Sequence, residues 1–389
     1  METAFPHAVT GDGPPFRRPS SGGSAFPVPP AVNRTDVLRR FTLTNLSDMS
    51  RRSFLHYTGL AAVSTPLLAA CGGQGGGGAA AGGKGLSMQL GFLLDNGQLG
   101  EAVALGKGWY ADNGIDFSFK PGGPSIDGIA MVAGGQSQVG QVSSSPSLML
   151  AVSQGVPIKA FAAGVQQHPY AYFSRPEKPV RTPADLAGKK VGVQATGKVL
   201  MSALLAKNGI PEKEVEVVAV GADVTPLTTG QVDVWTGWLS NVAALRPLNG
   251  RYVAMRLWDA GIRLYANPYY ATTRTLEQDS AKLQKFVSAT AAGWKYAREN
   301  VDEAVALLVK NAPTLKAADM KAQAEVLLKY TFDQTTAAQG WGAMDKTLWQ
   351  QQLDMWAQLK QFKGTPPTVD KVATTAVLDA TAGTRPKLG

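Results

Sequence analysis

Short apolar runs alternate with segments of helical period along most of this chain. The first alternation predicts strands at 87–94, 115–119, 138–142 and 158–162 and helices at 98–110, 125–133 and 146–154. A second alternation begins at residue 182 and predicts strands at 191–193, 215–220 and 232–235 and helices at 198–207 and 239–245. One more strand starts at residue 269, and the helical period then continues through 278–299, 301–311, 316–330 and 345–362. This order is typical of two α/β lobes with largely parallel sheets and a helical C-terminal section.

The stretch MSRRSFLHYTGLAAVSTPLLAACGG (49–73) has the layout of an export signal. A polar segment with Arg51 and Arg52 precedes an uncharged apolar run (54–70), which ends at Cys71. The run contains Gly and Pro and falls short of the roughly 20 residues that a helix needs to cross a bilayer. The paired arginines before Ser-Phe-Leu resemble a twin-arginine motif, which implies export of an already folded protein. We therefore expect 49–70 to be a signal peptide that is removed.

Cys71 is the only cysteine of the chain. The preceding Leu-Ala-Ala resembles a bacterial lipobox, which implies that the thiol is acylated and anchors the protein at the outer face of the cytoplasmic membrane. A buried structural cysteine is the alternative. Residues 71–85 are then a lipidated cysteine with a glycine-rich tether, because such a chain behaves as a random coil. Residues 1–48 are rich in Pro, Gly and Ser, so they are either disordered or an extension upstream of a true start at Met49.

Composition disfavours several function classes. The 389 residues carry a net charge of +9, but the first 70 hold seven Arg and four acidic residues, so the remaining 319 carry +6. That part has no dense Lys/Arg run of the kind that binds nucleic acid. His168 is its only histidine and no cysteine follows Cys71, which argues against a zinc site, a Ser-His-Asp triad and a catalytic thiol. With no GxSxG or GxxxxGK[ST] motif either, we expect no enzyme, no metal and no cofactor.

Three stretches carry a family resemblance. GKGWYADNGID (106–116), SQVGQVSSSPSLMLAVSQGVPIKAFAA (137–163) and DLAGKKVGVQ (185–194), in this order and spacing, are similar to extracytoplasmic substrate-binding proteins of ABC importers. Within these, the chain resembles the branch that holds nitrate, sulfonate and taurine binders and thiamine-pyrimidine-precursor binders.

The resemblance implies the type II periplasmic-binding protein fold, in which two α/β lobes close on a ligand cleft. It implies that lobe one comprises 86–180 and 266–389 and that lobe two comprises 181–265. It also implies a monomer whose partners are a small-molecule ligand, an ABC permease and its ATPase.

Ligands of open α/β sheets lie beyond the carboxyl ends of strands, near helix N-termini. Polar residues and glycine stand at these ends here, namely Asp95, Asn96, Ser143, Ser144, Ser145, Gln194, Thr196 and Gly197. The serines could instead cap helices. At the end of a later strand, Trp235 and Trp238 could form a flat slot for a ring, with Tyr265 on the facing wall. Core packing is the alternative for one of the two tryptophans.

Asp95 stands in FLLDNGQ (92–98), where the pyrimidine-precursor binders carry Trp-Thr-Pro-Asn and a histidine. A carboxylate here favours an uncharged or cationic heteroaromatic ligand such as a thiamine-pyrimidine precursor, because it would repel a small anion. A binder of a sulfonate, taurine or nitrate is the alternative. An enzyme that resembles the pyrimidine synthases would need a cysteine-rich motif, which this chain lacks. An adhesion or signalling module on the same scaffold is a third hypothesis.

Overall fold

The computed structural model describes residues 83–123 and 125–389, apart from the side chain of Thr196. The expected signal peptide with Arg51 and Arg52, the cysteine at position 71 and the tether as far as residue 82 lie outside the described residues. The described residues belong to one compact unit and contain two five-stranded sheets. None of their helices is both long enough and apolar enough to cross a membrane.

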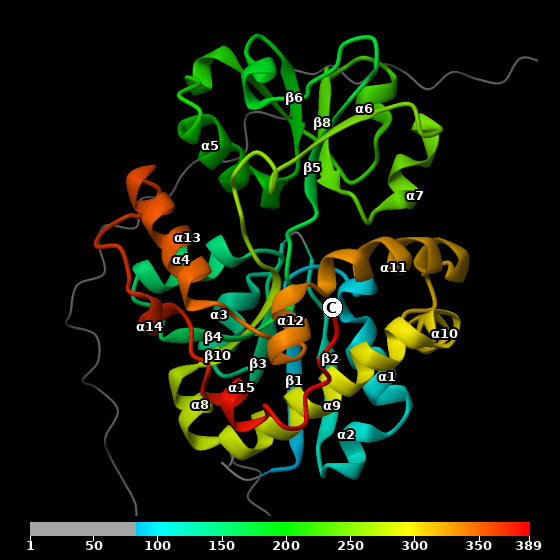
Figure 1. Ribbon diagram of the computed structural model, residues 1–389, viewed down its shortest axis with the longest axis vertical. Helices are drawn as coiled ribbons and strands as arrows, with labels where there is room; N and C mark the ends of the chain where they lie inside the picture. Colours follow the sequence, from blue (N-terminus) through cyan, green and yellow to red (C-terminus); the bar gives the residue numbers. More distant parts are fainter. Residues whose placement is uncertain (1–82, 124) are drawn as a thin grey trace, which may run out of the picture. The chain divides into compact units, whose positions relative to one another are not determined.

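The first sheet, in lobe one, has the strand order β2-β1-β3-β10-β4 (Figure 1). Its strands are β1 (Gly85–Leu90), β2 (Asp116–Lys120), β3 (Val139–Gln141), β4 (Ile158–Val165) and β10 (Ala266–Thr272). β1 runs parallel to β2 and β3, whereas β10 runs antiparallel to β3 and β4. β4 and β10 are buried along almost their whole length, as expected for strands that are covered on both faces.

The second sheet, in lobe two, has the order β7-β6-β8-β5-β9. Its strands are β5 (Tyr170–Ser174), β6 (Lys190–Val193), β7 (Glu216–Ala219), β8 (Val234–Trp238) and β9 (Val253–Arg256). β6 runs parallel to β7 and β8, and β5 runs antiparallel to β8 and β9. The two sheets therefore have the same arrangement. In each, the fourth strand, β10 or β5, is the one that follows a passage of the chain from the other lobe. Both predicted α/β lobes are present, but their sheets are mixed where we expected largely parallel ones.

The chain passes between the lobes twice. The first crossover joins β4 to β5, and the second joins β9 to β10. We expected lobe one to continue to residue 180, but β5 hydrogen-bonds to β8 and β9 and so lies in lobe two. The first crossover is therefore the short segment between Val165 and Tyr170. The apolar stretch YAYFS (170–174) follows this segment and could belong to either sheet. The residue pattern of a strand does not determine which other strand it pairs with.

Helices cover both sheets. Those of lobe one before the first crossover are η1 (Asn96–Gln98), α1 (Leu99–Gly106), α2 (Trp109–Asp112), α3 (Gly128–Ala133) and α4 (Ser145–Ser153). Those of lobe two are η2 (Pro183–Leu186), η3 (Ala195–Gly197), α5 (Lys198–Lys207), η4 (Glu212–Glu214), α6 (Thr225–Thr228), α7 (Val242–Leu245) and η5 (Arg246–Leu248). After β10 follow α8 (Thr273–Gln278), α9 (Ser280–Glu299), α10 (Val301–Asn311), α11 (Ala317–Thr331), α12 (Gln334–Gln339), α13 (Lys346–Gln358), α14 (Val369–Val372) and α15 (Ala376–Ala380). The helix predicted at 98–110 is interrupted at Gly108, whose φ of 79° is left-handed.

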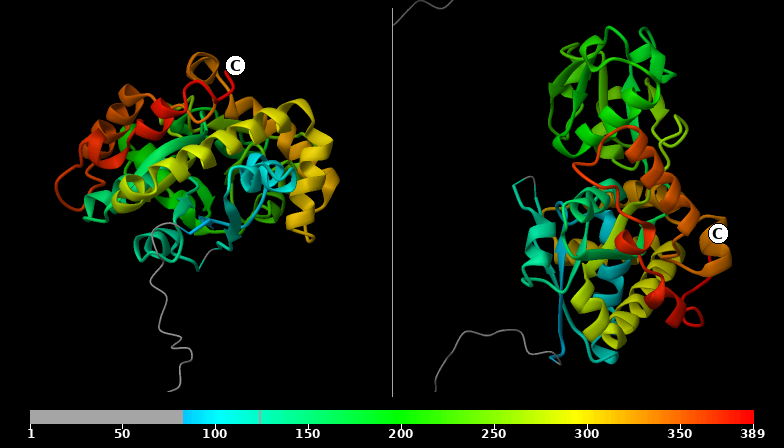
Figure 2. Two further views of the ribbon diagram at one scale, coloured as in Figure 1. Left: turned by 90° about the horizontal axis from the view of Figure 1, so that it is seen from below. Right: turned by 90° about the vertical axis from the view of Figure 1, so that its left-hand side faces the viewer.

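Helix α9, the long yellow helix of Figures 1 and 2, packs against α1 in lobe one. Gly100 of α1 and Gly293 of α9 meet at the crossing. A Cβ atom on Gly293 would lie 2.0 Å from the carbonyl oxygen of Gly100, and one on Gly100 would lie 2.2 Å from the ring of Trp294. Only glycine fits at these two positions, and the close approach of the helices buries Trp294 completely.

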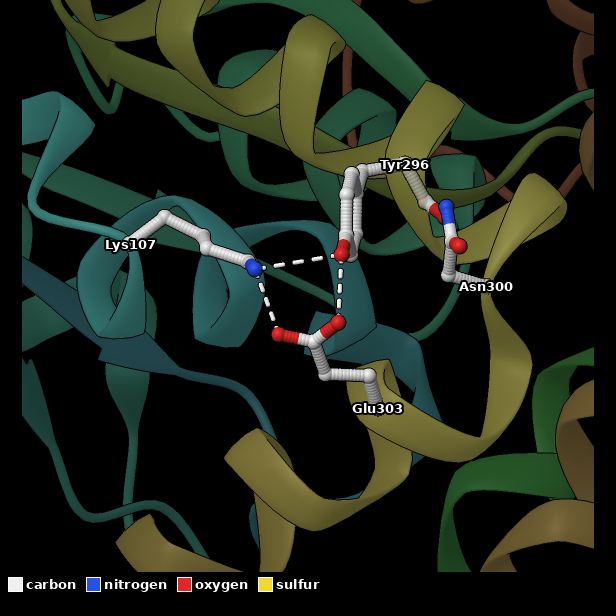
Figure 3. A network of polar contacts seen from close by, with 4 residues as sticks. All are labelled: Lys107, Tyr296, Asn300 and Glu303. Atoms are coloured by element: carbon white, nitrogen blue, oxygen red, sulfur yellow. Dashed lines mark hydrogen bonds and ion pairs between the residues drawn. The ribbon is translucent and has the colours of Figure 1, made fainter.

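A polar network joins the same helices on the surface (Figure 3). The Lys107 ammonium donates to Tyr296 Oη at 3.1 Å and forms an ion pair with Glu303, and Tyr296 Oη donates to Glu303. The hydrogen bond between Lys107 and Glu303 is the main reason that the pKa of the lysine is raised and the pKa of the glutamate is lowered. The network fastens α10 to α9 and to the end of α1.

Candidate functional site

A cavity of about 150 Å³, the cleft cavity, lies at the carboxyl ends of β1, β3, β6 and β8. Lobe one contributes the loop after β1 and the end of β3, and lobe two contributes the residues that follow β6 and end β8. Two apolar side chains, Phe92 and Leu93, belong to its lining, and Leu93 is 58% exposed. The cavity therefore stands where ligands of α/β sheets bind, with walls from both lobes.

Four of the residues predicted from the sequence line the cleft cavity, namely Asp95, Ser143, Gln194 and Trp238. They come from the ends of four different strands, so the carboxyl-end rule selected residues that meet at one cavity.

Asp95 is fixed by the start of η1. Its carboxylate accepts a hydrogen bond of 2.7 Å from the Gly97 N–H, and its own N–H donates to Gln98 Oε1 at 3.0 Å, which completes a capping box. The residue is exposed along the cleft, but the protein surrounding its carboxyl group displaces solvent and raises its pKa. The Gly97 hydrogen bond opposes this rise. The carboxyl group is thus held in place and is easier to protonate than a free aspartate.

Amide side chains dominate the rest of the polar lining, namely Gln98, Gln141, Gln194, Asn241, Asn267 and Gln323. Gln98 Nε2 donates to Gln141 Oε1 at 2.5 Å, and Gln194 Nε2 donates to the carbonyl of Thr236 at 3.1 Å. The cavity lining among the described residues contains no lysine, arginine or histidine. Asp95 is its only charged side chain.

Asn267 lines the cleft cavity and has an unusual backbone conformation. Its φ of 50° is left-handed, and its side chain lies against Gly97, where an added Cβ would come within 2.5 Å of Asn267 Nδ2. Strained residues of this kind cluster at functional sites. Sequence reasoning missed Asn267, which precedes the strand that was predicted to start at residue 269.

The two tryptophans of β8 lie in different environments. Trp238 lines the cleft cavity, half-buried, with its ring 5.2 Å from that of His168. Trp235 is 0% exposed and packs in the core of lobe two, 5.6 Å from the Phe173 ring. The slot predicted from both indoles is therefore wrong, because residues three apart on a strand point to opposite faces of the sheet.

Three further predicted residues, Asn96, Ser144 and Ser145, do not line the cleft cavity. Asn96 donates to the carbonyl of Met320 at 3.1 Å, Ser144 forms an isolated bridge with Ala266, and Ser145 Oγ donates to Gln352 Oε1 at 2.5 Å.

Tyr265 and Gly197 pack inside the protein. Tyr265 Oη accepts a hydrogen bond of 2.8 Å from the Asp345 N–H, and a Cβ on Gly197 would lie 1.9 Å from Tyr170 Oη. The side chain of Thr196 lies outside the described part of the chain.

His168 stands in the first crossover, next to the cleft cavity. It is 1% exposed, and burial lowers its pKa to about 3, so it is neutral at physiological pH. Its Nδ1 accepts a hydrogen bond of 3.2 Å from the Tyr170 N–H. Within residues 83–123 and 125–389, no group of three or more His, Cys, Asp and Glu side chains could hold a metal ion. His168 is thus a buried, neutral side chain of the first crossover.

Comparison with known proteins identifies relatives of this architecture. Residues 97–304 match the family described as NMT1/THI5 like. The riboflavin-binding protein RibY of Chloroflexus aurantiacus is 28% identical over 264 residues, which are 64% of this chain and 73% of RibY. The periplasmic aliphatic sulphonate binding protein SsuA of Escherichia coli has a TM-score of 0.56 at 16% identity, covering 74% of this chain and 91% of SsuA. The desulfurization enzyme DszB has a TM-score of 0.50 at 14% identity, covering 77% of this chain and 99% of DszB.

These matches confirm the predicted periplasmic-binding protein fold with its C-terminal helices. The solved structures are too distant in sequence to carry more than the fold, and DszB shows that the fold also serves enzymes. The family match covers more than half of the chain, so the chain belongs to the NMT1/THI5-like family.

Proposed function

We propose that this protein is an extracytoplasmic solute-binding lipoprotein that delivers an uncharged heteroaromatic molecule to an ABC importer. One observation carries the choice of ligand class. The cleft cavity combines one indole, one carboxyl group and six amides, and its described lining has no cationic side chain.

An anionic ligand suits this lining poorly. A sulfonate or nitrate buried between two lobes is best balanced by cationic side chains, whereas the only charged side chain in the described lining is Asp95, whose carboxylate would repel an anion. An uncharged heteroaromatic ring offers both donors and acceptors along its edge. Amides can pair with either kind of atom, and a carboxylate can accept from a ring or exocyclic N–H. The ring face can stack on Trp238.

The size of the cleft cavity favours a small ring system. Its volume of about 150 Å³ lies below the roughly 300 to 1,000 Å³ of sites for drug-sized ligands. A single-ring thiamine-pyrimidine precursor therefore needs less movement of the lobes than a flavin. RibY is named a riboflavin-binding protein, and its similarity supports the heteroaromatic class. Opening at the hinge would admit the larger ring system.

Attachment to the membrane is the second part of the proposal. Cys71 would be acylated after export directed by Arg51 and Arg52, and the glycine-rich segment would tether the lobes near the permease and its ATPase. The protein would act without catalysis, because the described lining offers neither a thiol nor an imidazole.

Titration calorimetry with a panel of ligands tests the proposal. The panel contains an aminopyrimidine thiamine precursor, riboflavin, taurine and an alkanesulfonate. We expect one of the heteroaromatic compounds to bind most tightly. We expect Trp238→Ala to weaken this binding at least tenfold, because stacking contributes about 0.5 to 1.5 kcal/mol beyond the loss of the buried indole surface.

Two further variants sharpen the test. Trp235→Ala is the matched control, since it should lower stability without removing a ligand contact. Asp95→Asn should weaken a ligand that donates to the carboxylate and should tighten an anion. Tightest binding of taurine or the alkanesulfonate, strengthened by Asp95→Asn, would sink the heteroaromatic proposal.

A further inference from the structure

A second concavity lies between α5 of lobe two and α13 of the C-terminal section, the two helices at the left of Figure 1. We call it the α5–α13 groove. Its volume is about 620 Å³, and none of its lining residues belongs to the cleft cavity. This volume falls within the roughly 300 to 1,000 Å³ typical of small-molecule sites. The groove is thus large enough for a ligand of its own.

One face of α13 forms a wall of the groove. Its residues repeat at the three- and four-residue spacing of a helix face, namely Leu348, Gln351, Gln352, Met355 and Gln358. The adjoining face carries the buried Trp349, Leu353 and Trp356, which pack into the main core. The wall is therefore rigid and mixes apolar side chains with amides.

Two cations face this wall from lobe two and the second crossover. The stem of Lys207 passes over Gly261, where an added Cβ would lie 2.9 Å from the lysine Cε, so this glycine leaves room for the side chain. The Arg263 guanidinium stands 5.8 Å from the Trp258 ring centroid. Neither cation forms an ion pair with any described residue. Both line the groove.

A buried amide in the same lining lacks a partner. Gln352 is 0% exposed, and its Oε1 accepts the hydrogen bond from Ser145. Its Nε2 has no hydrogen-bond partner within the described part of the chain. A buried N–H group without a partner costs free energy that a bound acceptor atom would recover. The one carboxylate of the lining, Asp354, already accepts a hydrogen bond of 2.7 Å from Gln350.

We propose that the α5–α13 groove binds an amphipathic anion, that is, a small molecule with a phosphate or carboxylate group and an apolar body. The anionic group pairs with Lys207 and Arg263, since a guanidinium binds phosphate or carboxylate with two parallel hydrogen bonds. The apolar body lies along Leu348 and Met355. Gln352 donates to an acceptor atom of the ligand. The site is separate from the cleft in position and in chemistry, because the described cleft lining has no cation.

Titration calorimetry on the full chain in detergent tests this site with hexyl phosphate as the probe. We expect saturable binding that the double variant Lys207→Gln/Arg263→Gln weakens at least tenfold. The matched control is Lys213→Gln/Arg251→Gln, which removes the same charge from exposed positions of lobe two outside the groove. Its affinity for hexyl phosphate should stay within a factor of two of the unmodified protein.

Further probes distinguish the contributions of the head group and the body. Hexan-1-ol lacks the anion and inorganic phosphate lacks the body, so each should bind more weakly than hexyl phosphate. Trp238→Ala should leave hexyl phosphate binding unchanged, because this indole belongs to the cleft cavity. The proposal is overturned if the control loses as much affinity as the groove variant. The proposal is also overturned if hexan-1-ol binds as tightly as hexyl phosphate, if Trp238→Ala abolishes the binding, or if no saturable binding is seen.

Discussion

Glu101 is a fully buried carboxyl group in lobe one, and we predict that it lowers the stability of the protein at neutral pH relative to mildly acidic pH. Its Oε1 accepts a hydrogen bond of 2.5 Å from Tyr269 Oη on β10. Tyr110 on α2 and Trp294 on α9 also face it. Burial outweighs these contacts and raises the pKa of Glu101 from 4.5 to about 7. The folded protein therefore holds a proton that the unfolded chain releases.

The sign and size of the effect follow from this pKa difference. A group whose pKa is raised on folding stabilises the fold fully below its unfolded pKa, here about 4.5, and this contribution is lost as the pH rises through the folded value of about 7. The gap between the two values corresponds to about 3 kcal/mol, because each pKa unit is worth about 1.36 kcal/mol. Between pH 5 and pH 8 the loss should be about 2 to 3 kcal/mol.

Urea unfolding of Glu101→Gln and of the unmodified protein, each from pH 5 to pH 8, measures this loss. The glutamine keeps an acceptor for Tyr269 but cannot ionise. The stability of the variant relative to the unmodified protein should rise across this range by the amount above. Glu303→Gln is the control and should differ from the unmodified protein by a nearly constant amount from pH 5 to pH 8, because Lys107 lowers the pKa of Glu303 and the stabilising effect of this carboxylate is lost only in stronger acid. A constant difference between Glu101→Gln and the unmodified protein from pH 5 to pH 8 would refute the reasoning.

Three further predictions concern other parts of the chain. Gly293→Ala should lower the free energy of unfolding by about 1 to 3 kcal/mol in urea, since its methyl group would collide with Gly100, whereas Gly106→Ala meets only the end of the Leu307 side chain and should cost less. Affinity for a ligand that donates to Asp95 should fall in calorimetry as the pH drops through the raised pKa of this carboxyl group, and a pH-independent affinity would contradict the contact. Cys71→Ala should move the protein from the membrane fraction to the soluble fraction, and unchanged membrane association would refute lipidation.

The sequence identified the elements of the fold better than their partners in space. Alternating patterns predicted both lobes and the C-terminal helices, because strand and helix periods are local properties. They predicted neither β5 nor β9 as a strand and placed β5 in lobe one, because a short run that is buried at every position, as β5 is, lacks the alternation that marks a strand.

The candidate site likewise contains residues that the sequence could select and one that it could not. The rule that ligands bind at the carboxyl ends of strands selected Asp95, Gln194 and Trp238, which all line the cleft cavity. Strand alternation alone would have separated Trp238 from Trp235, had β8 been known to continue to residue 238. Asn267 could not have been found this way, because its side chain meets the cleft through Gly97, 170 positions earlier in the chain, and not through a local pattern.

The place of β10 in the first sheet also affects how the chain can fold while it is being made. β10 stands between β3 and β4, which do not pair with each other. A ribosome that has released β4 must therefore synthesise about 100 more residues before Ala266 emerges and joins the two halves of the sheet. At roughly 5 to 20 residues per second, this interval lasts on the order of 5 to 20 s. Throughout it the eight-residue strand IKAFAAGV has both edges unpaired, so the nascent protein needs shielding from self-association.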